Sequence, residues 1–215
     1  MKRVIYKMDY IYEIEHNLPR EVCEKIIDKF EADDRKTAGI TWDQVIDPTR
    51  PNDFKKSTDL QITHMEGWSE IDCILKDKLT EGLKEYEQHI KAAYEYDSIP
   101  FRSTVGGIFA NMIDRGYQIQ RTKKNEFYTW HHDAVNRSGR VITFIWYLNT
   151  LDPKIDGGTT DFECGKSIVP KQGKLIFFPA TWTYIHRGKP VLSDNTKYIC
   201  TGWVLQNDPP IQTNN

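Results

Sequence analysis

The feature that most constrains the fold is a series of short strand-like runs after about residue 100. Turn signals rich in Gly, Pro, Asn and Asp separate the runs, which is the pattern of an all-β sandwich or barrel. The runs cover residues 117–122, 127–134, 141–148, 158–162, 166–169, 173–178, 183–187 and 197–205. Eight closely spaced strands predict a double-sheet jelly roll, also called a double-stranded β-helix.

The first hundred residues show helical spacing instead. Apolar side chains recur every three or four positions in residues 19–30 and again in residues 68–94, which predicts two helices. The region between them, residues 34–66, is polar and irregular apart from one strand candidate, DLQIT. This region and the stretch 121–126 are the candidate lids over any site in the β half.

We predict an α+β, mainly β protein with a jelly-roll core and supporting N-terminal helices. A chain of 215 residues is long enough for one core and short for two. The expected organisation is therefore a single domain over residues 1–215. Residues 1–100 would give helical support, and residues 101–207 would form the jelly-roll core.

Composition excludes several classes of protein. The net charge of −2 gives no field that would attract nucleic acid or an anionic membrane. No apolar stretch has the length of a signal-peptide core or of a membrane span. The four cysteines are far apart without CxxC spacing, so neither a disulfide framework nor a zinc site is indicated. We expect a cytoplasmic protein without nucleic-acid or membrane partners.

The stretch YTWHHDA places two histidines and an aspartate side by side. Residues two apart share a face of a strand, so His131 and Asp133 point together while His132 points away. With His186 from another strand candidate, they would form the two-His, one-carboxylate set that leaves three positions open on a non-haem iron. The alternative is a His–Asp hydrogen bond on a solvated strand face.

A metal site of this kind with a bound 2-oxo acid needs a cation beside it to balance its negative charge. Iron(II) with one carboxylate carries +1, so a dianionic 2-oxo acid would leave −1 inside a mostly apolar barrel. Lys197, in the last strand candidate, is placed to compensate that charge. Arg187 and Lys189 are nearer to His186 in sequence, but they belong to an HRGKP turn and are predicted to be solvated.

A longer pattern joins these residues. Its elements are Tyr128-Thr-Trp-His131-His-Asp133, Arg140, Tyr147-Leu-Asn149, Gly157-Gly-Thr-Thr160, Pro170-Lys-Gln-Gly173, His186, Lys197 and Trp203. Their order and spacing over about residues 117–205 resemble the 2-oxoglutarate- and Fe(II)-dependent dioxygenases, most closely the prolyl 4-hydroxylase-like branch. Residues 1–100 are similar only as the helical support that such enzymes carry.

The resemblance implies that 2-oxoglutarate and O₂ give succinate and CO₂ while a C–H bond is hydroxylated, with ascorbate as a candidate reductant. By resemblance, His131, Asp133 and His186 hold iron. In the same way Lys197 holds the C5 carboxylate of 2-oxoglutarate, and Tyr128 contacts the cosubstrate or the target. The resemblance also places two further residues at the substrate side of the pocket, namely Arg140 and Trp203.

Two departures leave the substrate open. Prolyl 4-hydroxylases that act on collagen-like sequences have His where this chain has Leu205, and commonly Pro where it has Trp130. We expect hydroxylation of a peptidyl, prolyl-type or amino-acid side chain. The alternatives are a small metabolite or nucleobase as substrate, and a non-catalytic jelly-roll binding module that keeps the metal site as a relic.

Overall fold

The structure is a computed structural model that describes residues 9–96, 100–101, 105–134 and 138–206. The ends of the predicted domain, residues 1–8 and 207–215, therefore lie outside the described residues. None of the helices in the described part of the chain has both the length and the apolarity needed to cross a bilayer.

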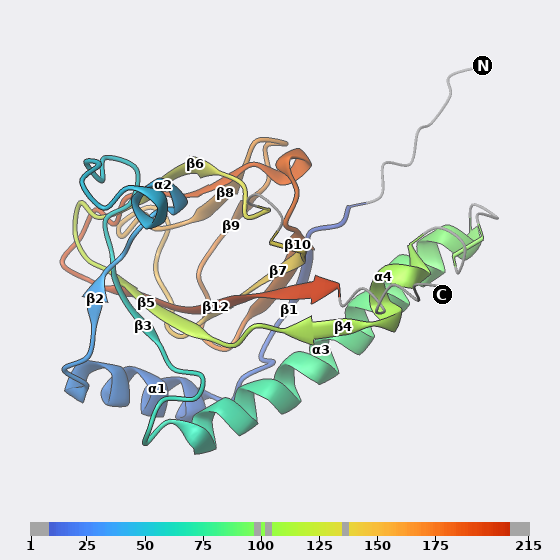
Figure 1. The fold of residues 1–215 in the computed structure, drawn as a ribbon, viewed down its shortest axis with the longest axis horizontal. Coiled ribbons are helices and arrows are strands. Elements are labelled where there is room, and N and C mark those ends of the chain that lie inside the picture. The colour runs from blue at the N-terminus through green and yellow to red at the C-terminus, as the bar shows by residue number, and fades with distance from the viewer. Residues whose placement is uncertain (1–8, 97–99, 102–104, 135–137, 207–215) are drawn as a thin grey trace, which may run out of the picture.

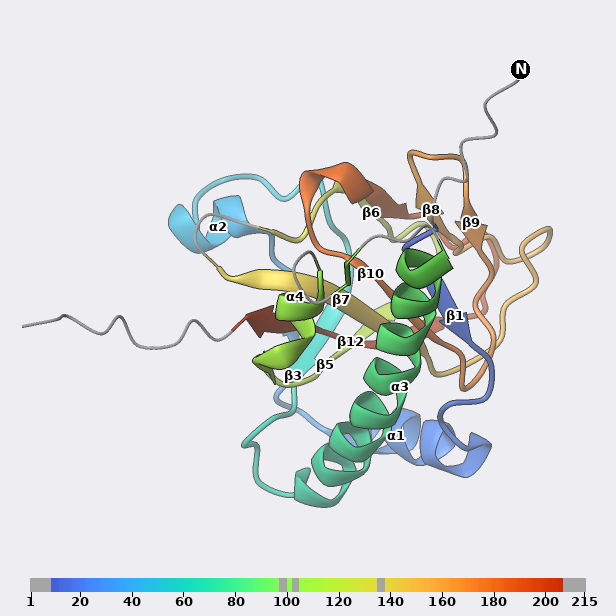
Figure 2. The same ribbon diagram turned by 90° about the vertical axis from the view of Figure 1, so that its right-hand side faces the viewer.

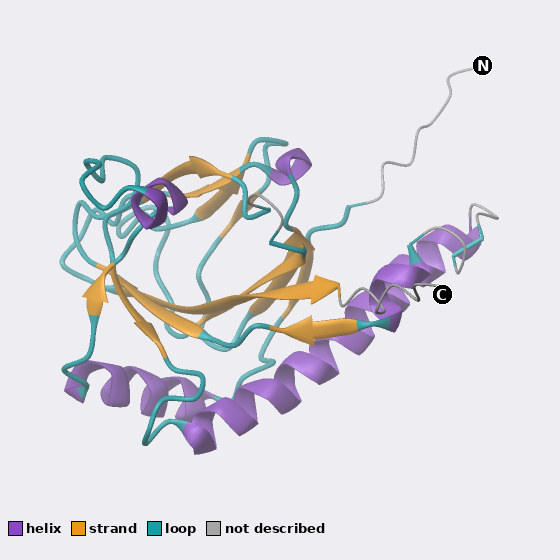
Figure 3. Cartoon of the chain, in the orientation of Figure 1, coloured by secondary structure: helices purple, strands orange, loops and turns teal. Residues whose placement is uncertain are grey.

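Two antiparallel sheets form the core (Figures 1 and 3). The larger sheet has the order β1 (Tyr12–Ile14), β10 (Leu175–Pro179), β7 (Arg140–Tyr147), β12 (Lys197–Gln206), β5 (Gln118–Thr122), β3 (Thr58–Gln61) and β2 (Thr37–Ala38), and β4 (Met112–Asp114) also pairs with β12. The smaller sheet has the order β6 (Tyr128–His131), β11 (His186–Gly188), β8 (Thr160–Phe162) and β9 (Ser167–Ile168). From β6 onward the chain passes back and forth between the sheets, as a jelly roll requires.

The described residues form the helices α1 (Arg20–Ala32), α2 (Trp42–Ile46), α3 (Ser69–Tyr96) and α4 (Gly106–Ala110), and a 3₁₀ turn η1 (Trp182–Tyr184) before β11. The short α2 lies on the other side of the larger sheet from α1 and α3, beside β6 (Figure 1). Helices α1 and α3 run along the outer face of that sheet (Figures 1 and 2). At Gly82 of α3, an added Cβ would lie 2.7 Å from Leu175, so glycine lets the helix pack close to β10.

Alternation along the central strands separates two apolar clusters. On β7, Phe144 and Trp146 join the cluster beneath the helices, while Ile145 and Tyr147 join the cluster between the sheets. The inner face of the same strand also carries Thr143, which lines a cavity between the sheets. The period of two therefore divides β7 into a packing face and a face that looks toward the pocket.

The predicted mainly β jelly roll with N-terminal helices is confirmed, but some element boundaries were wrong. The run 127–134 ends as a strand at His131, and the run 183–187 begins with the 3₁₀ turn, so strand pairing starts only at His186. The sequence pattern also missed β1, β2, β4, α2 and α4. These elements have two to five residues each, which is too short for a periodic signal.

Candidate metal site and pocket

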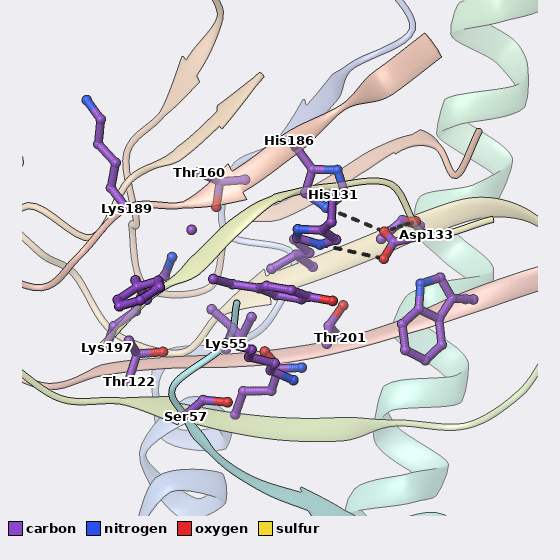
Figure 4. A pocket seen from close by; sticks show the side chains of 18 residues that line it. Lys55, Ser57, Thr122, His131, Asp133, Thr160, His186, Lys189, Lys197 and Thr201 are labelled. Atoms are coloured by element: carbon purple, nitrogen blue, oxygen red, sulfur yellow. Dashed lines mark hydrogen bonds and ion pairs between the residues drawn. The ribbon is translucent and has the colours of Figure 1, made fainter. Parts of the chain in front are cut away.

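The two histidines and the aspartate of the predicted set meet between strands of the smaller sheet. His131 ends β6, His186 begins β11, and the two residues face each other in the pairing register. Nε2 of His131 lies 3.8 Å from Oδ1 of Asp133, and Nε2 of His186 lies 3.5 Å from Oδ2. Candidate ligand atoms of all three lie within 4.8 Å of one another (Figure 4).

Backbone carbonyls fix the orientation of both imidazoles. Nδ1 of His131 lies 2.7 Å from the carbonyl oxygen of Thr129, and Nδ1 of His186 lies 3.0 Å from that of Tyr184. A carbonyl only accepts, so each Nδ1 carries the proton and donates it. Each Nε2 is then left with a free lone pair directed at the common centre, which is the arrangement typical of metal-binding histidines.

Burial and mutual interaction set the protonation states. Desolvation, together with the neighbouring His186, holds the pKa of His131 far below its ordinary value, so this imidazole is neutral. Burial alone would raise the pKa of Asp133, but the two histidines and a hydrogen bond from Thr143 outweigh it and the pKa is lowered. Two imidazole nitrogens and one carboxylate oxygen form a donor set that suits divalent iron.

Strand alternation correctly predicted that Asp133 lies beside His131, but Asp133 is not part of the strand. Asp133 lies beyond the end of β6, and its N–H donates to the carbonyl of Ala180 at 3.1 Å. A guanidinium N–H of Arg140 donates to the carbonyl oxygen of Asp133, also at 3.1 Å. These contacts, rather than strand alternation, bring the carboxylate beside His131, while His132 is exposed.

Lys197 lines the same cavity away from the histidines (Figure 4). Its side chain is 5% exposed, and no described residue gives its ammonium a hydrogen bond or an ion pair. The nearest aromatic ring is that of Tyr147, with its centroid 5.6 Å from Nζ. Burial lowers the pKa of Lys197 to about 8, only partly offset by Asp161. A buried cation without a partner is costly unless an anion joins it.

The two cations of the HRGKP turn are not simply solvated. Nζ of Lys189 lies 3.2 Å from a carboxylate oxygen of Asp161, and a guanidinium nitrogen of Arg187 lies 3.1 Å from the same oxygen. Both side chains remain partly exposed. Asp161 therefore forms an ion pair with both cations of the turn, whereas Lys197 has no ion pair among the described residues.

Of the three residues predicted to lie in the pocket, namely Tyr128, Arg140 and Trp203, two line the cavity. The ring of Tyr128 stacks on His131 with a centroid distance of 3.5 Å and an interplanar angle of 12°. Arg140 lies 3.5 Å from the ring centroid of Trp203. Tyr128 and Trp203 line the cavity, whereas Arg140 lies outside its lining and contacts Asp133 instead. The indole N–H of Trp203 is buried with no partner among the described residues.

Neither departure from the prolyl 4-hydroxylase pattern alters the cavity lining. Trp130 is 45% exposed and lies under the guanidinium of Arg187, 4.4 Å from its ring centroid. Leu205 is buried and pairs in register with Arg140. The cavity lining includes neither residue.

The cavity-lining residues that were not predicted as site residues include Lys55, Thr143 and Thr160. Thr143 had a signal, because it is a polar residue inside the apolar run VITFIWYL. Oγ1 of Thr160 accepts a 2.8 Å hydrogen bond from the hydroxyl of Tyr147. Lys55 had no signal, because it lies in the irregular region before β3.

Lys55 forms a buried ion pair beside Tyr128. Its Nζ lies 2.6 Å from Oδ2 of Asp59 and 5.2 Å from the ring centroid of Tyr128. The backbone around Lys55 pairs with that of Tyr128, so the predicted lid region 34–66 joins the edge of the smaller sheet. The ion pair connects this region to β3.

Lys55→Met is expected to lower the free energy of unfolding by about 3–5 kcal/mol, because Asp59 would keep a buried charge without a counter-ion and only the hydroxyl of Ser57 would donate to it. Urea unfolding followed by circular dichroism measures the change. The control is Lys56→Met at the exposed neighbouring position, where a change within about 0.5 kcal/mol is expected. Equal destabilisation by both variants would contradict the role given to the ion pair.

Comparison with known proteins agrees with this geometry. Residues 117–205 match the family described as the 2OG-Fe(II) oxygenase superfamily. The chain matches none of the curated proteins with which it was compared.

Three solved structures share the fold. The viral collagen prolyl hydroxylase of Paramecium Bursaria Chlorella virus-1, in its 2-oxoglutarate complex, is 21% identical with a TM-score of 0.62 over 93% of this chain and 97% of its own. A Trichoplax adhaerens prolyl hydroxylase with a hypoxia-inducible-factor peptide is 16% identical with a TM-score of 0.67 over 93% and 84%. A Pseudomonas putida prolyl-4-hydroxylase is 15% identical with a TM-score of 0.58 over 92% and 93%.

At these identities the likeness to the solved structures shows the fold. Residues 117–205 match the 2OG-Fe(II) oxygenase superfamily, and the converging His131, Asp133 and His186 fit a dioxygenase that uses Fe(II), 2-oxoglutarate and O₂.

Proposed function

We propose that this dioxygenase hydroxylates a C–H bond in a peptidyl, prolyl-type side chain. In this proposal His131, Asp133 and His186 hold Fe(II), and Lys197 binds the C5 carboxylate of 2-oxoglutarate. The observation that carries the proposal is a single cavity that holds both the three converging ligands and a buried, unpaired lysine.

The charges in the cavity balance when both cofactors are bound. Fe(II) with the Asp133 carboxylate carries +1, the Lys197 ammonium adds another +1, and dianionic 2-oxoglutarate cancels both. Lys55 is already paired with Asp59, and Lys189 with Asp161. The charges of iron, Asp133, Lys197 and 2-oxoglutarate then cancel, which favours a neutral substrate side chain beside them over a charged metabolite.

The residues of the chain bind, orient and shield the reactants. When bound, iron and 2-oxoglutarate supply the oxidation of the substrate C–H bond by O₂, with succinate and CO₂ as the other products. Tyr128 packs flat on His131 and holds that imidazole in its ligating orientation. Ile145 and Ile199, which line the cavity, exclude water from its interior.

An apolar surface close to the cavity supports a peptide substrate. Four large apolar side chains before and around Lys55 are more than half exposed, namely Ile40, Val45, Ile46 and Phe54. The carbonyl of Phe54 accepts a 2.8 Å hydrogen bond from Thr129, one residue from Tyr128. Exposed apolar groups beside a site are typical of surfaces that bind another polypeptide. The structural neighbour from Trichoplax adhaerens holds a peptide fragment.

Of the two alternative functions, the structure argues against a non-catalytic binding module but does not distinguish a small-molecule substrate from a peptide. A non-catalytic module would be expected to have lost a ligand or the cosubstrate cation, whereas Asp133, both histidines and Lys197 are all in place. A small metabolite or nucleobase would use the same cofactors and the same ligands. The difference between these substrates and a peptide is therefore a matter for direct turnover experiments.

The proposal is tested by adding the protein, loaded anaerobically with Fe(II), to 2-oxoglutarate, O₂, ascorbate and a substrate library. One arm contains proline-bearing peptides, and the other contains free amino acids, metabolites and nucleobases. We expect succinate and the mass of one added oxygen atom in the peptide arm, with His131→Ala as the inactive control. Product only in the second arm would overturn the peptide substrate, and no succinate above the control in either arm would overturn the whole proposal.

A further inference from the structure

The carboxylate of Asp133 has one hydrogen-bond donor among the described residues. Oγ1 of Thr143 donates to Oδ2 of Asp133 at 2.7 Å, and both side chains are buried. The hydroxyl is the donor, because a carboxylate oxygen accepts hydrogen bonds. Hydrogen bonds to an ionised group are short and strong, as this one is.

The Nε2 atoms of His131 and His186 lie 3.8 and 3.5 Å from the carboxylate oxygens, and the other hydrogen bonds of Asp133 act on its backbone. Ala180 accepts from its N–H, and Arg140 donates to its carbonyl oxygen. These contacts fix where the residue lies, but they leave the rotation of the carboxylate free. Thr143 sits on the inner face of β7, in register with Phe178 of β10 and Trp203 of β12. Its hydroxyl is therefore held by a central strand that is paired on both sides.

Carboxylates bind metals through one oxygen or through both. A two-oxygen contact from Asp133 would use a position that the cosubstrate or O₂ needs, since two histidines and one oxygen leave three positions open. With Oδ2 engaged by Thr143, Oδ1 is the oxygen that carries no hydrogen bond. We propose that Thr143 is a positioning residue that keeps Asp133 a one-oxygen ligand and so preserves the third open position. This inference rests on the metal site of the proposed function.

The test compares Thr143→Ala with Thr143→Ser. Both variants lose the methyl group of Thr143, and only the Ala variant also loses the hydroxyl, so the comparison isolates the hydroxyl. Co(II), a stable stand-in for Fe(II), is titrated into each protein by calorimetry, and its visible absorption reports the coordination before and after 2-oxoglutarate is added. Thermal unfolding without metal shows whether each variant is folded.

We expect Thr143→Ala to bind Co(II) about 10–100-fold more weakly than the wild type, as is typical when the outer partner of a metal ligand is removed. Its absorption spectrum should change, while Thr143→Ser should keep both the affinity and the spectrum of the wild type. Equal affinities and identical spectra for the Ala and Ser variants would overturn the role of Thr143. If the Ala variant does not fold, Thr143→Val keeps the volume of the side chain and is judged in the same way.

The failures of the two proposals can be told apart. If the wild type binds Co(II) and 2-oxoglutarate but the Ala and Ser variants have equal affinities and spectra, only the role proposed for Thr143 is refuted. If the wild type does not bind Co(II) at all, the proposed metal site is refuted, and so is the inference about Thr143.

Discussion

Asp133→Ala is expected to abolish turnover and to weaken Fe(II) binding by more than about 100-fold, beyond the 10–100-fold typical of outer partners. The variant removes the only anionic ligand from the candidate set of described residues. Two neutral imidazoles would then have to hold a dication in a buried site without compensating charge. Anaerobic Fe(II) titration and succinate formation measure the two effects separately.

The fold is expected to survive this change. Burial holds His131 neutral, so removal of the carboxylate leaves no imidazolium without a partner at that position. The main cost is the hydroxyl of Thr143, which loses its acceptor and destabilises the protein by about 1–3 kcal/mol. His132→Ala is the matched control, because this neighbouring histidine is exposed. Equal loss of metal binding in both variants would contradict the ligand assignment.

The sequence predicted the β half well because its strands are half-buried and regularly punctuated. In VITFIWYL every second residue faces the helices, and the others face the smaller sheet, so the run is apolar on both faces. That pattern is strong enough to place β7 within one residue. Strands β1, β2 and β4 exist only through pairing with partners far away in the chain, and such pairing leaves no local signal.

The metal ligands were identified from spacing, but their geometry comes from tertiary contacts. Asp133 meets His131 because Ala180, Arg140 and Thr143 hold it there, after the strand has ended. No local rule reports contacts of this kind. For the same reason the sequence did not show Lys55, whose place beside Tyr128 depends on pairing across more than seventy residues.

Lys197→Met is expected to make the ligand-free protein more stable while it abolishes 2-oxoglutarate binding. Burial lowers the pKa of Lys197 from 10.5 to about 8, so the folded state disfavours the charged form. At a neutral pH this difference corresponds to a destabilisation on the order of 3 kcal/mol, which methionine would remove. The same ammonium is the unpaired cation that the far carboxylate of 2-oxoglutarate needs. Calorimetric titration of 2-oxoglutarate in the presence of Mn(II) measures the loss.

The pH dependence separates this explanation from a general packing effect. Below about pH 8 both the folded and the unfolded states carry the proton, so the gain from Lys197→Met is complete. Between pH 8 and 10.5 the unfolded state binds more protons than the folded state. The stability of the wild type therefore rises with pH, and its difference from the variant shrinks. Lys189→Met, which removes a partly exposed lysine already paired with Asp161, should show neither the gain nor its pH dependence. A gain for Lys197→Met that stays constant up to pH 10.5 would show that the buried charge is not its cause.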